Sequence, residues 1–282
     1  MINDRYFALL QRLFPQALLS RLVGKIANSR NFFVKNYLIN LAIWKFEIDL
    51  RDSIGKTADF YTSFNEFFTR KLKRGARIID SNCNTIISPA DGTITQYGSI
   101  THDTLIQAKH KRFTIQELLS VEKQHFTDFL IIYLAPKNYH RVHMPINGRL
   151  TKMTYIPGRL FSVNTRTAKH VKQLFAKNER VICYFDTIIG EIAIILVGAL
   201  LVASIVTTWH HTVTPNCIKK LYTWEYQNQN IVFKKGDEIG YFNFGSTVIC
   251  LFPENKVILE PVMNNNNTNM GNVLGKINLT IV

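Results

Sequence analysis

Residues 192–206 read IAIILVGALLVASIV, a stretch that is apolar throughout apart from Ser204 and small residues. A helix that crosses a bilayer needs roughly 20 such residues, which this stretch does not reach. Its β-branched side chains and Gly198 favour one or two buried strands over a transmembrane helix. We therefore expect this stretch to form part of a buried β-structure.

Short β-rich runs lie on both sides of this stretch from about residue 85 onward, separated by Gly, Pro, Asn and Asp. They cover residues 85–88, 129–134, 149–156, 181–185, 231–233 and 247–252. One short helix, over 115–120, interrupts them, and residues 264–267 are predicted to be a polar loop. Because strands and helices do not alternate, the pattern predicts an α+β fold with a mainly antiparallel β body and amphipathic N-terminal helices.

The first 47 residues predict those helices. Apolar residues recur there at steps of three and four: Phe7, Leu10, Phe14, Leu18 and Leu22. Pro15 is expected to start a second helix, and a third, over 31–46, carries Phe33, Tyr37, Leu41 and Trp44 on one face. Basic helices of this kind lie in a bilayer interface or pack on the rest of the protein, and the pattern alone allows both.

A further helix is predicted over 63–73, because Ser63 and Glu66 have the spacing of a capping box. A basic cluster closes it: Arg70, Lys71, Lys73, Arg74 and Arg77. Such a cluster is usually a solvated face, although it can also bind phosphates.

Composition limits the class of protein. The chain has 282 residues, is 46% hydrophobic and carries a formal charge of +14, so it is too apolar to be disordered and favours negatively charged partners such as nucleic acid or anionic lipid. Its four cysteines include no CxxC pair, which predicts neither a zinc site nor a disulfide framework. No secretory signal is recognisable, and a reducing cytoplasm fits best.

Four segments contain residues suited to chemistry: Ser-Pro-Ala-Asp-Gly at 88–92, Tyr-His-Arg-Val-His-Met-Pro at 139–145, Pro-Gly-Arg-Leu-Phe-Ser-Val-Asn at 157–164, and Gly-Ser-Thr at 245–247. Taken singly, each has an ordinary interpretation. The Asp91 side chain can hydrogen-bond to the backbone of its own turn, and a Gly-Ser pair commonly forms a turn or a kink in a strand. His140 and His143 suit proton transfer near neutral pH, but their spacing is poor for a metal, and we predict no metal site.

In this order the four segments resemble phosphatidylserine decarboxylase of the bacterial membrane-associated type, over residues of about 60 to 253. The resemblance implies a proenzyme that cuts itself between Gly245 and Ser246 into a large β chain, 1–245, and a small α chain, 246–282. In that family the serine hydroxyl attacks the preceding carbonyl to form an ester, and Gly245 leaves room for the attack. Elimination and hydrolysis then convert Ser246 into a covalent pyruvoyl group and release ammonia.

The resemblance also implies residue roles. Asp91, His143 and Ser246 match the family's Asp-His-Ser triad, in which the histidine activates the weak serine nucleophile. His140 matches the residue used in decarboxylation, as a proton donor to the intermediate. Phe161 and Ser162 are expected to contact the substrate.

The implied reaction converts phosphatidylserine to phosphatidylethanolamine. The pyruvoyl carbonyl forms a Schiff base with the serine headgroup and serves as the electron sink when carbon dioxide leaves. A lipid substrate favours membrane binding by the N-terminal helices, because each Lys or Arg near an anionic surface adds about 1 kcal/mol. We accordingly expect a membrane-associating helical region, 1–47, and a β-rich catalytic domain, 48–282. The predicted location is the cytoplasmic face of the cell membrane, peripherally bound, with no nucleic-acid partner.

Two positions depart from the family's common pattern. Phe244 stands where Leu or Met is usual, and Ala203 stands where Gly is usual. Neither change removes a reactive group, so we expect effects on efficiency rather than on activity.

Two other functions remain open at this point. A pyruvoyl decarboxylase acting on a soluble amino acid would explain Ser246 but not the basic, apolar N-terminus. A basic, non-enzymatic protein that binds lipid or nucleic acid would leave His143 and Ser246 as ordinary structural residues.

Overall fold

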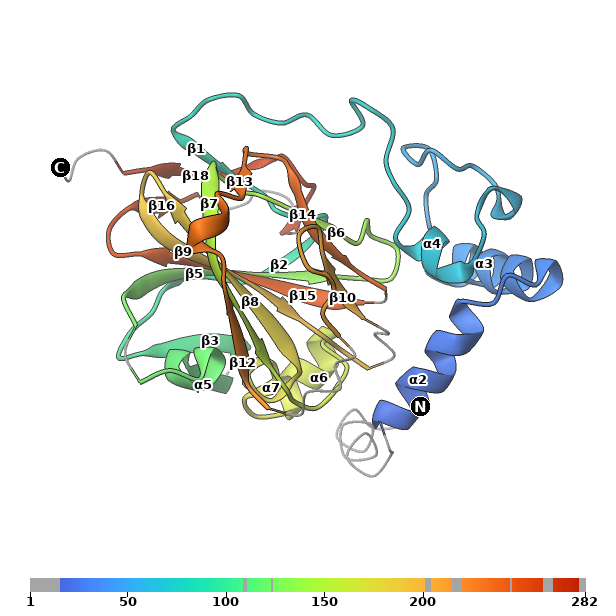
Figure 1. Cartoon of the computed structure of the whole chain (residues 1–282), viewed down its shortest axis with the longest axis horizontal. Coiled ribbons are helices and arrows are strands. Elements are labelled where there is room, and N and C mark those ends of the chain that lie inside the picture. The colour runs from blue at the N-terminus through green and yellow to red at the C-terminus, as the bar shows by residue number, and fades with distance from the viewer. Residues whose placement is uncertain are drawn as a thin grey trace.

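The computed structural model describes residues 16–108, 111–122, 124–200, 204–214, 220–243, 245–260 and 266–278. The predicted α+β class is confirmed, with a β-rich body that follows N-terminal helices (Figure 1). The expectations for residues 1–15, for Ala203 and for Phe244 lie outside the described residues.

The helices are α2 (Gln16–Ala27), α3 (Phe32–Phe46), α4 (Phe64–Phe68), α5 (Ile115–Leu119), α6 (Thr165–His170) and α7 (Leu174–Lys177), with 3-10 turns η1 (Ala58–Phe60) and η2 (Gln227–Gln229). The strands up to residue 200 are β1 (Thr85–Ile87), β2 (Gly92–Ser99), β3 (Thr104–Ala108), β4 (Lys111–Thr114), β5 (Phe126–Leu134), β6 (Arg141–His143), β7 (Gly148–Ile156), β8 (Arg180–Thr187) and β9 (Gly190–Val197). The later strands are β10 (Ile205–Thr207), β11 (His211–Thr212), β12 (Tyr222–Glu225), β13 (Val232–Phe233), β14 (Glu238–Phe242), β15 (Ser246–Pro253), β16 (Val257–Leu259), β17 (Asn267–Thr268) and β18 (Val273–Ile277).

A nine-stranded sheet forms the centre of the body, in the order β12-β7-β8-β9-β15-β5-β2-β17 with β13 also paired to β7. Its pairings are antiparallel, as predicted. The stretch 192–206 supplies most of β9 and the start of β10, which confirms the expected buried strands.

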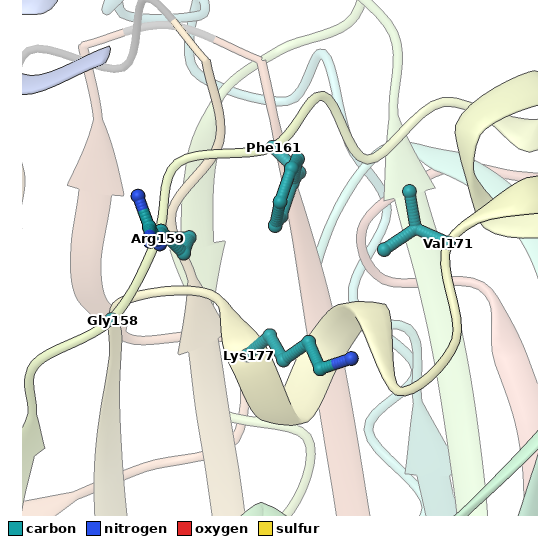
Figure 2. A pocket seen from close by; sticks show the side chains of 5 residues that line it. All are labelled: Gly158, Arg159, Phe161, Val171 and Lys177. Atoms are coloured by element: carbon teal, nitrogen blue, oxygen red, sulfur yellow. The ribbon is translucent and has the colours of Figure 1, made fainter. Parts of the chain in front are cut away.

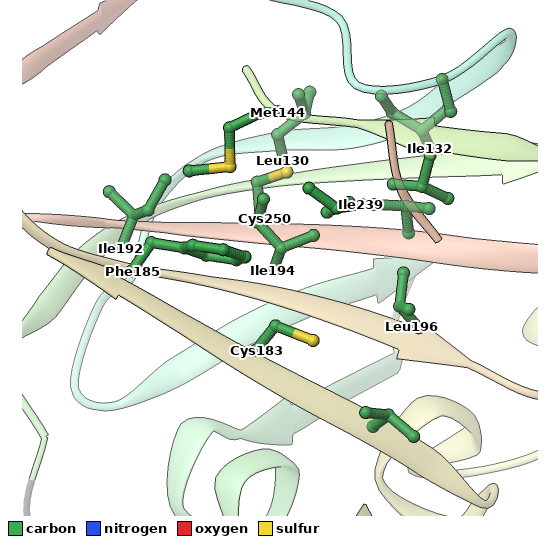
Figure 3. Packing of buried hydrophobic residues seen from close by; sticks show 14 of the residues in the cluster. Leu130, Ile132, Met144, Cys183, Phe185, Ile192, Ile194, Leu196, Ile239 and Cys250 are labelled. Carbon is green, nitrogen blue, oxygen red and sulfur yellow. The ribbon is translucent and has the colours of Figure 1, made fainter. Parts of the chain in front are cut away.

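Both faces of this sheet are covered, which explains why its strands are apolar without alternation. Along β9, Ile192, Ile194 and Leu196 belong to a core shared with two smaller sheets, β1-β18-β16 and β11-β10-β14-β6. Figure 3 shows part of this packing, including Ile194, Leu196 and Cys250. The intervening residues of β9 pack on the opposite side, against α5, α6, α7 and the β3–β4 hairpin (Figure 1).

Three local predictions were wrong. Helices α6 and α7 also interrupt the strands, and at six and four residues they are too short to show a helical period. Helix α4 ends at Phe68 instead of 73, although Ser63 caps it as predicted. Within the expected loop 264–267, Asn267 pairs with Thr93 in β17, while residues 264 and 265 lie outside the described part of the chain.

The N-terminal helices lie to one side of the β body (Figure 1). Residues of α2 and α3, among them Ala27 and Ile39, share an apolar cluster with Ile48, Tyr61 and Phe67. The helical region therefore packs on the segment that follows it, and the division at residue 47 stays a prediction.

One edge of the nine-stranded sheet positions the candidate site. Six strands begin or end there: β7 at Ile156, β8 at Arg180, β9 at Val197, β15 at Ser246, β5 at Leu134 and β2 at Gly92. The loops that carry all four sequence segments leave the sheet at this edge.

Candidate functional site

Ser246 is the first residue of β15 and is fully buried. It pairs with Leu134 of β5, and its Oγ has no hydrogen-bond partner among the described residues. A buried hydroxyl without a partner costs about 1–3 kcal/mol, so its presence calls for an explanation. A Cβ at the preceding Gly245 would meet only the Leu134 carbonyl, at 3.8 Å, so the backbone here is uncrowded.

Asp91 lies immediately before β2 and is also buried. Arg77 donates to both of its carboxylate oxygens, at 3.0 Å from Nε and 2.5 Å from Nη2, and the Met270 amide donates to Oδ1 at 2.8 Å. The hydrogen bond with Asp91 raises the pKa of Arg77. The expectation that the basic cluster forms a solvated face was therefore wrong for Arg77.

His143 ends β6 and makes two hydrogen bonds through its ring. Its Nδ1 lies 2.7 Å from the Gly236 carbonyl, and its Nε2 lies 3.0 Å from the Tyr139 hydroxyl. Because a carbonyl only accepts, Nδ1 carries the proton and Tyr139 donates to the lone pair of Nε2. Burial lowers the pKa of His143, so the ring is neutral near pH 7.

His140 has the same tautomer as His143 and is more deeply buried. Its Nδ1 donates to the Asn138 carbonyl at 2.8 Å, and its ring lies 4.2 Å from the ring of Phe68 between centroids. Burial lowers the pKa of His140 to about 3, although the Asn138 carbonyl opposes that shift. Its Nε2 is buried with no hydrogen-bond partner in the described structure, like the Ser246 hydroxyl.

The two histidines face opposite ways, as their spacing predicts for a strand. His140 immediately precedes β6, and Val142, two residues later, packs in the core on the large sheet, while His143 lies on the other side of the strand. Ser246 faces the same core as Val248. His140 therefore shares the side of Ser246, and the nearby Leu134 carbonyl, opposite Ser246, acts on the pKa of His140.

The hydrogen bonds of a formed triad are not present in this uncut chain. Asp91 is bonded to Arg77, and His143 to Tyr139 and Gly236. Asp91 still acts electrostatically on the pKa of His143, which places the two groups in one neighbourhood. The catalytic roles inferred from the sequence stay predictions.

A cavity of about 520 Å³ adjoins the third segment. Gly158, Arg159, Phe161, Val171 and Lys177 line it, and Figure 2 shows the Phe161 ring between Arg159 and Val171. Residues 157–164 are irregular, as expected for a loop, and Asn164 caps α6. Phe161 thus lines this cavity, whereas Ser162 is not one of its lining residues.

Sequence reasoning missed the partners of the site residues. Tyr139 was part of the histidine segment, and Arg70 and Arg77 belonged to the basic cluster, but nothing local indicated that Tyr139 and Arg70 are buried beside the site or that Arg77 binds Asp91. Arg70 is 4% exposed.

The described residues show neither a metal-binding cluster nor a membrane-spanning helix. They contain no group of three or more His, Cys, Asp or Glu arranged to hold a metal ion. Of the helices described here, none combines the length and the hydropathy that a membrane span requires.

Comparison with known proteins identifies the family. A family profile described as phosphatidylserine decarboxylase matches residues 64–276, and a second, described as PSD, matches residues 6–47. The chain belongs to the phosphatidylserine decarboxylase family. The family inferred from the four segments, and the carboxy-lyase class that goes with it, are confirmed.

Relatives in this family match nearly the whole chain. The phosphatidylserine decarboxylase proenzyme of Francisella philomiragia subsp. philomiragia is 53% identical over 279 residues, which cover 98% of this chain and 99% of the relative. That of Francisella tularensis subsp. novicida is 55% identical over 269 residues, covering 94% and 95%. Both names describe proenzymes, proteins made as inactive precursors.

Proposed function

We propose that this chain is a phosphatidylserine decarboxylase that matures by cutting itself between Gly245 and Ser246. The products are a β chain, 1–245, and an α chain, 246–282, that begins with a pyruvoyl group made from Ser246. One observation carries the proposal: the buried, unpartnered Ser246 hydroxyl lies at the sheet edge where all four family segments meet.

Self-cleavage needs a base for the Ser246 hydroxyl. His143 is neutral and carries a lone pair on Nε2, with Asp91 nearby to orient and stabilise the ring once it is charged. In the uncut chain Tyr139 donates to this nitrogen. Cleavage by this route therefore requires Tyr139 to release His143 before the proton can move.

Decarboxylation uses the group that cleavage creates. A pyruvoyl group at position 246 supplies the electron sink for loss of carbon dioxide. The site suits such a group, since the Ser246 side chain faces a buried, apolar interior that excludes water. His140 faces the same interior with an unprotonated Nε2, where it can take up a proton and return it.

The membrane surface is the proposed partner of α3. Phe33, Tyr37 and Trp44 of this helix are 79%, 69% and 77% exposed, while Lys35 is buried and donates to the Ala58 carbonyl. This arrangement reverses the usual pattern of a surface helix. Together with the charge of +14, it fits a helix that lies in the interface of an anionic bilayer, and we place the protein peripherally on the cytoplasmic face.

The cavity beside Phe161 is the proposed contact for the lipid. Its two cations, Arg159 and Lys177, suit a phosphate, and Phe161 and Val171 suit the first carbons of an acyl chain. Ser162, next to Phe161, is proposed to contact the headgroup.

Mass and activity of purified protein test this function. The wild-type protein should give two chains, the smaller with a blocked N-terminus, and should release carbon dioxide from phosphatidylserine vesicles. Ser246→Ala should stay a single chain near 32.5 kDa without activity. Carbon dioxide release from a free amino acid but not from the lipid would favour the soluble-substrate alternative, and an uncut wild-type chain would favour the non-enzymatic one.

A further inference from the structure

Arg70 is a buried cation without a carboxylate partner among the described residues. It follows α4, lies over the Phe67 ring at 5.6 Å, and donates through Nη2 to the carbonyls of Lys137 and Asn138, at 2.9 and 3.2 Å. Its Nε and Nη1 have no hydrogen-bond partner in the described structure. Keeping a guanidinium in such surroundings is costly, and the cost calls for a function.

The Asn138 carbonyl connects Arg70 to His140. It accepts from Arg70 Nη2 and from His140 Nδ1, and the Asn138 side chain closes the same loop by accepting from the Ala135 amide at 2.8 Å. The Nδ1 bond fixes the tautomer, because a proton on Nδ1 leaves the lone pair on Nε2. Phe68, two residues before Arg70, packs against the His140 ring.

We propose that Arg70 is a positioning residue for His140, holding the Asn138 carbonyl so that the Nε2 lone pair stays directed into the interior shared with Ser246. This role rests on the proposed decarboxylase function. The guanidinium also has an electrostatic effect on His140. Besides burial, the positive charge of Arg70 lowers the pKa of His140, while the carbonyls of Asn138 and Leu134 raise it. Arg70 thus helps to keep the ring unprotonated.

Kinetics give the first test. Arg70→Met is compared with Arg74→Met, a matched control in which an exposed arginine of the same segment loses its charge. Self-cleavage into two chains shows that each variant folds. We expect Arg70→Met to mature and to lose about 100-fold in kcat, the size of effect that a small misplacement of a reacting group produces. Its KM for phosphatidylserine should be unchanged, and Arg74→Met should match the wild type. Arg70→Lys, which can restore one carbonyl bond, should recover part of the loss.

A second test needs no decarboxylation. Imidazole ¹⁵N spectra of the uncut Ser246→Ala protein, assigned with His140→Gln, should show His140 as the neutral Nδ1–H tautomer. Adding Arg70→Met to this protein should give a mixture of His140 tautomers, and the His140 ring should take up a proton at a higher pH than in Ser246→Ala alone. This readout holds even if the single variant Arg70→Met, which keeps Ser246, does not mature. An unchanged His140 tautomer and an unchanged titration in these spectra would overturn the positioning role.

In the kinetic test, a raised KM of Arg70→Met with unchanged kcat would overturn it as well, because Arg70 would then bind the substrate. Absence of decarboxylation by the wild type would count against the proposed function alone.

Discussion

At the level of single residues, the site is defined by polar atoms that lack partners. Ser246 Oγ and His140 Nε2 are both buried and unbonded among the described residues, while Asp91 and His143 are fully hydrogen-bonded to other groups. A desolvated, unpaired group retains its reactivity and costs stability. His143 must therefore be released from Tyr139 before it can act as the proposed base for Ser246, whereas His140 Nε2 has no hydrogen-bond partner to release among the described residues.

This division of labour can be tested at the two histidines. His140→Ala should still cut itself but lose decarboxylation by about 100-fold or more, because its lone pair serves the later step. His143→Ala should remain a single chain, since it lacks the base for Ser246. Chain composition by mass spectrometry and carbon dioxide release report the two steps separately, and failure of His140→Ala to cleave would show that our assignment is wrong.

The pH dependence of cleavage follows from the direction of the His143 shift. Burial lowers the pKa of His143 below its ordinary value of 6.5, so the ring remains able to accept a proton in mildly acidic solution. The cleavage rate of newly made proenzyme should therefore fall to half of its value at about pH 8 only at a pH below 6.5. A rate already halved at pH 6.5, measured by gel densitometry over time, would contradict a neutral, buried base.

At the level of elements, α3 shows how a helix can face away from the core. Asn31 caps it through the amides of Phe33 and Val34, and only Lys35, Ile39 and Ala42 of the helix are buried. Phe33, Tyr37 and Trp44 are left outside the core, where they gain little stability from packing. Burial in a bilayer interface would recover about 25 cal/mol for each Å² removed from water.

Substitutions on α3 test this role. Replacing Phe33, Tyr37 and Trp44 by Ser should weaken binding to anionic vesicles by tenfold or more, about 1.4 kcal/mol or above, without preventing self-cleavage, because these exposed side chains are not part of the site. Cosedimentation with phosphatidylglycerol vesicles measures the binding. The matched control replaces Ile188 and Val232, exposed apolar residues of the β body, with Ser. Equal losses in both variants would speak against a specific role for α3.

At the level of the whole molecule, the proposed cut falls at the start of a central strand. β15 pairs with β5 along its full length and with β9 from Thr247 to Leu251, and β18, later in the same α chain, pairs with β1. The α chain is thus part of two sheets and of the main core. Breaking one peptide bond leaves these contacts intact.

The two chains should therefore stay together after cleavage. Size-exclusion chromatography in native buffer should elute the α and β chains as one species, and only denaturant should separate them. The Tm of the cut protein should rise with protein concentration, because unfolding releases two chains, whereas that of uncut Ser246→Ala should not. Dissociation of the wild type without denaturant would show that β15 is held less firmly than its pairing indicates.

The sequence by itself determined the α+β class, most strands of the central sheet and the family, because strand and helix periods and the order of short segments are local properties. Tertiary structure alone decided which histidine shares the interior of Ser246 and which groups bind Asp91. Asp91 accepts from Met270, 179 positions away, and Arg70 contacts Asn138, 68 positions away. No local pattern encodes such contacts, since they depend on how distant strands meet at one sheet edge.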